Sequence, residues 1–285
     1  MTFKEKSKIE EETLFYDIEL ETDNKQFVDP YLIYKSDDEL SEKCSNKIVG
    51  FFDELLRCAR EKDHDKACYM VKYLQENNEV RFGYSMNGPR GKGLGYNKGD
   101  ELYEMLCSSR AVTTGLVSDI FDSSILLENV GADKISDFTI NIILQELIEF
   151  TQEQCLKYNI AMEETKLRRP TWDSETNEWI SGNKIFLPTH GGKPIILVPK
   201  RYVNEDLVYN YQNFYNDQMI PYYEREVMIH PSHGLVKILK RGIVPARTKI
   251  RKQYPCLKEN VIDFILTHPE EYENFKNKKI RYAKL

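Results

Sequence analysis

The sequence lacks any run of about 18 apolar residues, the length that a helix needs to span a bilayer. Its N-terminal stretch MTFKEKSKIEEE has no apolar core of the kind found in secretory signals. The six cysteines form no C-x-x-C pair, which argues against a zinc knuckle and favours reduced thiols. These absences predict a cytoplasmic protein without a membrane span.

Common nucleotide-binding and hydrolase motifs are missing as well. Gly91 and Lys92 form the Gly-Lys pair of a P-loop, but Met86 and Gly93 stand where that motif needs a glycine and a hydroxyl residue. The even spacing up to Gly95 does not fit G-x-G-x-x-G, and no G-x-S-x-G occurs. The sequence therefore indicates no familiar nucleotide fold and no serine hydrolase.

Charge is unevenly distributed along the chain. The formal net charge of −6 argues against a protein that coats nucleic acid non-specifically. Residues 10–23 carry seven acids and no base, whereas residues 237–252 carry seven bases and no acid. Such a basic stripe can hold phosphates even in an acidic protein. Alternatively, both segments are solvated faces, or they pair with each other.

The 285 residues are enough for one large domain or two modest ones. We expect an α+β fold that is rich in helix, with a small mixed sheet and β-hairpins. Residues 1–165 are expected to form a helical α+β part with a glycine-rich loop and an acidic turn. Residues 166–285 are expected to form hairpins and a basic helical part. Alternatively, the chain is one continuous domain.

Hydrophobic periodicity and capping residues place the main elements. A capping box at residues 36–39 predicts a helix to about residue 59. Residues 14–20 alternate as in a strand, and Ser136 or Asp137 is expected to begin a long helix to about Tyr158.

The C-terminal part has clear turn signals. Trp172 and Trp179 flank one predicted hairpin turn, and Gly191 and Gly192 supply another. After Pro255 the pattern predicts helices.

A glycine-rich basic segment precedes one predicted helix. Five glycines between residues 87 and 99 surround Arg90 and Lys92. Glycines let a backbone approach an anion closely, and a helix N-terminus favours negative charge. Arg90 and Lys92 are therefore candidate phosphate contacts. The alternative is a flexible turn between two helices.

Two pairs of aspartates are the best candidates for chemistry, Asp119 with Asp122 and Asp133 with Asp137. Carboxylates four residues apart on a turn can converge on one magnesium ion, which prefers oxygen ligands. Asp133 and Asp137 are therefore candidate metal ligands. Alternatively, Asp133 is a turn residue and Asp137 caps the next helix.

The order of motifs resembles the PD-(D/E)XK nuclease superfamily. A helix with Glu101 and Glu104 precedes the aspartates, and the apolar run at residues 195–199 ends in Lys200. The resemblance implies that Glu104, or Glu101, is the helix acid and that Lys200 polarises a water molecule. It also implies magnesium bound by an aspartate of the turn, Asp133 or Asp137.

The sequence departs from that family in two ways. Val198 stands where the family has an acid, and the helix predicted at residues 137–158 and a hairpin lie between the aspartates and Lys200. The stretches GADKISDFTINII and IILVPKRYV also resemble a family of uncharacterised bacterial proteins found in phage-defence contexts. That second resemblance implies a partner protein from a defence operon.

The basic stripe offers further candidate phosphate contacts. The alternation of Arg247, Lys249 and Arg251 would place three cations on one face of an extended strand. Aromatic residues nearby either stack bases or belong to the core. They are Tyr211, Phe214, Tyr215, Tyr222 and Tyr223.

These features together predict a protein that acts on nucleic acid. The expected activity is that of a magnesium-dependent nuclease effector in a bacterial anti-phage defence system. One alternative is a non-catalytic nucleic-acid-binding or adaptor subunit that works with a partner ATPase or nuclease. Another is a nucleotide-binding protein that uses the loop at residues 88–95.

Overall fold

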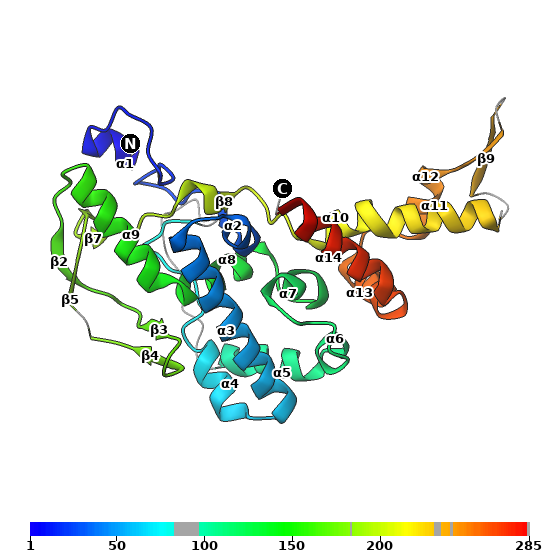
Figure 1. The fold of residues 1–285 in the computed structure, drawn as a ribbon, viewed down its shortest axis with the longest axis horizontal. Coiled ribbons are helices and arrows are strands. Elements are labelled where there is room, and N and C mark those ends of the chain that lie inside the picture. Colours follow the sequence, from blue (N-terminus) through cyan, green and yellow to red (C-terminus); the bar gives the residue numbers. More distant parts are fainter. Residues whose placement is uncertain (83–96, 183, 231–234, 240–241, 284–285) are drawn as a thin grey trace.

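The computed structural model of the protein describes residues 1–82, 97–182, 184–230, 235–239 and 242–283 (Figure 1). The fold is α+β, with 54% of the residues in helices and 13% in small antiparallel sheets. No helix in the described part of the chain is long and apolar enough to cross a membrane.

In the described part of the first half of the chain, the regular structure is almost all helix. Its helices are α1 (Phe3–Ser7), α2 (Pro30–Lys35), α3 (Glu39–Glu61), α4 (His64–Val71), α5 (Asn97–Ser108), α6 (Arg110–Thr113), α7 (Ile120–Leu126), α8 (Ala132–Ile142) and α9 (Leu144–Lys157). The long helix α3 lies at the centre and packs against α4, α5, α7, α8 and α9. Its stripe of Ile48, Phe51, Phe52 and Leu55 is buried, as the periodicity predicts.

The strands form two-stranded antiparallel sheets. They pair as β1 (Phe27–Val28) with β8 (Val203–Asn204), β2 (Glu163–Lys166) with β5 (Lys184–Leu187), β3 (Thr171–Asp173) with β4 (Glu178–Ile180), β6 (Thr189–His190) with β7 (Lys193–Pro194), and β9 (Val236–Leu239) with β10 (Gly242–Pro245). The expected mixed sheet is therefore wrong for the described residues, where the single parallel pairing is an isolated bridge between Asn24 and Phe82.

Both predicted turns are confirmed. Trp172 lies opposite Trp179 in the β3–β4 pair, and their ring centroids are 5.1 Å apart. Gly191 and Gly192 connect β6 to β7 with φ of 58° and 72°, values that residues with a side chain rarely adopt. Each hairpin is therefore set by the residues that the sequence singled out.

The predicted strand at residues 14–20 is wrong. That segment makes only isolated bridges, one of them between Phe15 and Pro199. Leu14 is 50% exposed, whereas Phe15, Ile18 and Leu20 are buried. The buried positions therefore do not follow the period of two that a half-buried strand requires.

Two predicted helix starts are also corrected. Helix α3 is capped by Asp38, whose side chain accepts a hydrogen bond from the Ser41 amide, while Ser36 ends α2. The expected single helix to Tyr158 is two helices that meet at Ile143, and the first of them begins at Ala132. The Thr139 hydroxyl donates to the Ile135 carbonyl, a contact that bends helices.

The C-terminal part is built from α10 (Tyr211–Phe214), a π-helical turn η2 (Tyr215–Met219), α11 (Ile220–Ile229), α12 (Arg247–Gln253), α13 (Lys258–Thr267) and α14 (Pro269–Ala283). The π-helical turn is defined by a hydrogen bond from the Ile220 amide to the carbonyl of Tyr215, five residues earlier. The next residue, Pro221, has no N–H and so donates no hydrogen bond to the preceding turn. In Figure 1, α11 projects from the body and carries β9 and β10 at its far end, with α12 alongside. One hydrophobic core runs from Phe3 to Phe275 and joins this part to the rest.

Candidate functional site

Asp133 and Asp137 both lie on α8, one helical turn apart and on the same face. Asp133 is exposed in the first turn, whereas Asp137 is mostly buried. Burial, assisted by the negative charges of Glu76 and Asp133, raises the pKa of Asp137 to about 8, against the opposing charge of Arg169. Asp137 is therefore a neutral acid over most of the physiological pH range.

Arg169 is the cation of this cluster. Its guanidinium donates to the carbonyl oxygens of Glu76 at 2.6 Å and Tyr73 at 3.4 Å, and so lies against the chain that follows α4. Burial raises the pKa of Glu76 and lowers that of Arg169. We call Glu76, Asp133, Asp137 and Arg169 the acidic cluster. Sequence reasoning missed Glu76 and Arg169, because they reach α8 only through the fold.

Metal binding at the acidic cluster would rest on two carboxylates. Asp133 and Asp137 can present oxygens on one face of α8, which suits a hard cation such as magnesium. Across the described ranges, no group of three or more His, Cys, Asp or Glu side chains is arranged to hold a metal ion. A magnesium ion here would therefore keep several waters.

The other residues implied by the nuclease resemblance lie elsewhere. Lys200 begins the short 3-10 helix η1 (Lys200–Tyr202), and its ammonium forms an ion pair with Glu12. Glu104 is exposed on α5. Neither contributes to the pKa shift of Asp137, whereas Arg169 does. The segment before Lys200 is not a strand of a sheet, so nothing directs its side chain toward the aspartates.

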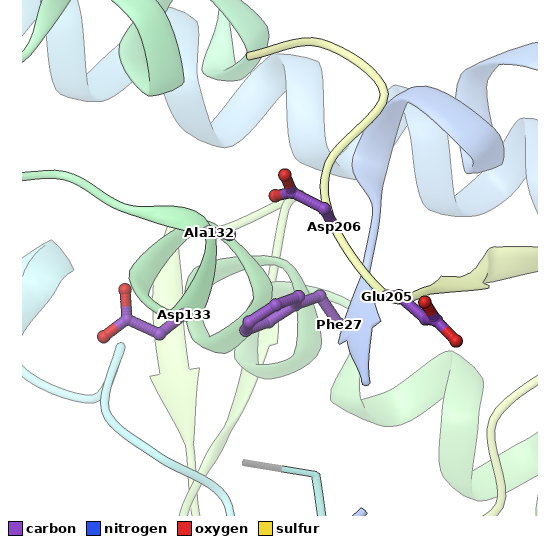
Figure 2. A pocket seen from close by; sticks show the side chains of 5 residues that line it. All are labelled: Phe27, Ala132, Asp133, Glu205 and Asp206. Atoms are coloured by element: carbon purple, nitrogen blue, oxygen red, sulfur yellow. The ribbon is translucent and has the colours of Figure 1, made fainter. Parts of the chain in front are cut away.

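A pocket of about 420 Å³ opens beside the first turn of α8, lined by Phe27, Ala132, Asp133, Glu205 and Asp206. Figure 2 shows Asp133 and Glu205 on opposite sides of the Phe27 ring, with Asp206 next to Glu205 on the segment that follows β8. The three carboxylates therefore surround the pocket without pointing at one centre. Their charge favours a cation and disfavours a phosphate.

The other predicted aspartate pair serves packing. Asp119 caps α7, accepting a hydrogen bond from the Asp122 amide at 2.9 Å. The fully buried Asp122 accepts from the Ser118 amide at 2.8 Å, the Tyr272 hydroxyl at 2.5 Å and the Lys276 ammonium at 2.9 Å. These bonds occupy both of its oxygens and tie α14 to α7, so Asp122 has little capacity left for chemistry.

The C-terminal part of the basic stripe does not lie on an extended strand, and that prediction is wrong. Arg247, Lys249 and Arg251 lie on helix α12, where successive residues turn by about 100°. We call the projecting helix α11, with the π-helical turn η2 before it, the arm. Arg247 and Arg251, four residues apart, face the arm. Arg247 forms an ion pair with Glu224 at 3.4 Å, and Arg251 donates to Asn216 at 2.8 Å.

Lys249 and Lys252 occupy a different face of α12. Both are exposed, and neither forms an ion pair with any residue that the structure describes. The helix thus separates an arginine pair that contacts α11 and η2 from an outer lysine pair on the other side, and all four residues are exposed. Arg90 and Lys92, the other predicted phosphate contacts, lie outside the described residues.

Replacing Asp137 by asparagine is expected to stabilise the protein more at pH 8 than at pH 5. The folded pKa of about 8 lies above the unfolded value of about 3.9. Between these values the folded state holds a proton that the unfolded state has lost, so wild-type stability falls as pH rises. Asparagine carries no such proton. From pH 5 to pH 8, the free energy of unfolding of the variant relative to wild type should therefore increase by about 3–4 kcal/mol.

Urea denaturation at the two pH values measures this gain. Asp53→Asn on α3 is the matched control, because that exposed side chain is not among the charges that act on Asp137. If the free energy of unfolding depends on pH in the same way in the wild type and in Asp137→Asn, Asp137 is not held neutral in the folded protein.

Comparison with known proteins gives one family. No curated protein and no solved structure matches the chain. A family model described as "Domain of unknown function (DUF8370)" matches residues 6–210, from within α1 to the N-cap of α10. It covers the acidic cluster and ends before the arm with its basic helix. The chain therefore belongs to the DUF8370 family.

Proposed function

We propose that the protein binds nucleic acid through helix α12. The observation that carries this proposal is the outward lysine pair, Lys249 and Lys252, on a helix that lies alongside the projecting arm (Figure 1). The helix lies in the stretch from residue 237 to 252 that has seven bases and no acid. Phosphate contacts from such a stripe supply affinity that does not depend on sequence.

The contacts that α12 makes with the rest of the protein support this interpretation. Arg251 lies over the Tyr215 ring, 5.7 Å from its centroid, in addition to its bond to Asn216. Ile250, between the two arginine positions, is fully buried. The outer lysines therefore extend from a helix held in place on its opposite side, so binding requires little ordering of the protein.

Replacing Lys249 and Lys252 together by glutamate is expected to weaken nucleic-acid binding at least tenfold at low salt. The reversal removes two phosphate contacts and adds repulsion, and it should flatten the slope of log K against log salt by about 2. Fluorescence anisotropy with labelled oligonucleotides measures both quantities.

The matched control is Lys25→Glu with Lys193→Glu, which changes the net charge equally at exposed positions on other elements. Binding should persist in the control. If the α12 variant and the control lose affinity equally, the effect is one of net charge, and α12 is not the binding surface.

A second candidate function is magnesium-dependent cleavage of the bound strand at the acidic cluster. It is favoured by the raised pKa of Asp137, because strongly perturbed acids gather at functional sites. Asp133 and Asp137 would hold the magnesium ion once Asp137 had lost its proton, and the ion would supply an activated water. Arg169 would stand where the nuclease resemblance places a lysine.

Cleavage of duplex DNA, single-stranded DNA and RNA with magnesium or manganese tests the second candidate. The Asp133→Ala/Asp137→Ala variant should lose all cleavage while still melting cooperatively. Lys200→Ala should keep its activity, because Lys200 pairs with Glu12. No cleavage of any substrate, with binding intact, leaves the protein as a non-catalytic binding subunit. In either role, we propose a cytoplasmic bacterial protein that acts in anti-phage defence with a partner protein.

A further inference from the structure

Two tyrosines form a stacked pair at the end of the basic helix. Tyr254 follows α12 directly, and Tyr223 lies on α11. Their ring centroids are 3.6 Å apart, with an angle of 6° between the planes. Parallel rings at this distance have the geometry in which nucleic-acid bases stack on aromatic side chains.

The backbone and one face of Tyr254 are fixed. The Tyr254 amide donates to the carbonyl of Ile250 at 2.8 Å, and the Tyr215 hydroxyl donates to the carbonyl of Tyr254 at 2.7 Å. Tyr223 is supported in turn by Tyr222 and by the buried Phe264. Tyr254 therefore offers a stacking surface that is ordered before any ligand arrives.

Tyr254 packs against the hydrophobic core, and part of the residue remains exposed to solvent. The ring is half-buried, and within the described part of the chain its one aromatic contact is Tyr223. Lys252 lies two residues before it on the exposed face of α12. A base that stacked on the exposed part of the ring would extend the pair to three parallel rings, with Lys252 two residues away to contact the phosphates of the strand.

We propose that Tyr254 stacks an unpaired base, so that the protein prefers single-stranded over double-stranded nucleic acid. This inference rests on the proposed function and names its substrate class. Paired bases are stacked within the helix and present no free face, so a duplex can reach only the lysines. The single strand therefore gains a contact that the duplex lacks.

The test uses anisotropy titrations of the full chain with three probes of equal length: a thymine single strand, an abasic single strand and a duplex. Tyr254→Leu should weaken binding of the thymine strand about tenfold. Binding of the abasic strand and the duplex should stay unchanged. Tyr254→Phe keeps the ring and should bind as wild type. Tyr34→Leu removes a partly exposed tyrosine from α2 and is the control.

The outcomes separate the two proposals. Equal affinity of the wild type for thymine and abasic strands overturns the stacking role but leaves phosphate binding by α12 in place. Binding of no probe overturns the proposed function and this inference together. If Tyr254→Leu melts at a lower temperature than the wild type, the stacking role is judged from the wild-type protein alone. Tighter binding of the thymine strand than of the abasic strand then supports it, and equal binding overturns it.

Discussion

Replacing Lys276 by methionine is expected to lower the free energy of unfolding by about 3–5 kcal/mol. Lys276 lies on α14, and its ammonium contacts the carboxylate of Asp122 at 2.9 Å and that of Asp119 at 3.7 Å. Burial lowers the pKa of Lys276, but these two carboxylates raise it by more, so the pKa lies above its ordinary value. Without the ammonium, the carboxylate of the fully buried Asp122 keeps only neutral hydrogen-bond donors, and its charge is no longer compensated.

Urea denaturation measures the loss, and Lys278→Met on the same helix is the control, because Lys278 is exposed. A second change, Asp122→Leu, should not rescue the Lys276→Met variant. It would leave Ser118 and the Tyr272 hydroxyl without their buried acceptor. Equal stabilities of the Lys276→Met and Lys278→Met variants would contradict a structural role for this contact between α14 and α7.

Replacing Lys47 by methionine is expected to cost a similar 3–5 kcal/mol. Lys47 on α3 donates to both carboxylate oxygens of Glu146 on α9, at 2.9 and 3.0 Å. The two side chains are only 8% and 3% exposed. The single change therefore leaves one carboxylate buried and unpaired between two central helices.

The Lys47→Met/Glu146→Leu double variant should recover most of that loss, because it replaces both charges with apolar groups. One helical turn away, Lys43 pairs with Glu149 in a largely exposed setting. Lys43→Met should therefore cost less than about 1 kcal/mol, as surface pairs do. A double variant as unstable as Lys47→Met would show that Glu146 has partners beyond Lys47.

The elements that the sequence predicted correctly depend on local patterns. The apolar stripe of α3 repeats every three to four residues, and Gly191 with Gly192 can adopt a turn that few residues tolerate. The strand at residues 14–20 failed because its buried residues are chosen by distant partners such as Pro199. Alternation in the basic stripe likewise indicated a strand, whereas Ile250 anchors a helix.

The residues of the candidate site also include some that local sequence predicts and others that only the fold brings together. Asp133 and Asp137 are close in sequence, so their common face follows from the helix alone. Glu76 and Arg169 come to Asp137 from segments 61 and 32 residues away, and only the packing of α4 and the chain before β3 unites them. Lys200 was assigned by the order of motifs, and order along the chain does not fix distance in space.

The central claim is that nucleic acid binds along the basic helix, and cross-linking tests it most directly. A single strand that carries photoreactive thymine analogues is bound to the full chain and irradiated, and the modified peptides are identified by mass spectrometry. The account predicts cross-links within residues 236–254, with Tyr254 among the modified side chains. Cross-links confined to residues 6–210, with none on α12, would contradict it and would direct attention to the DUF8370 domain itself.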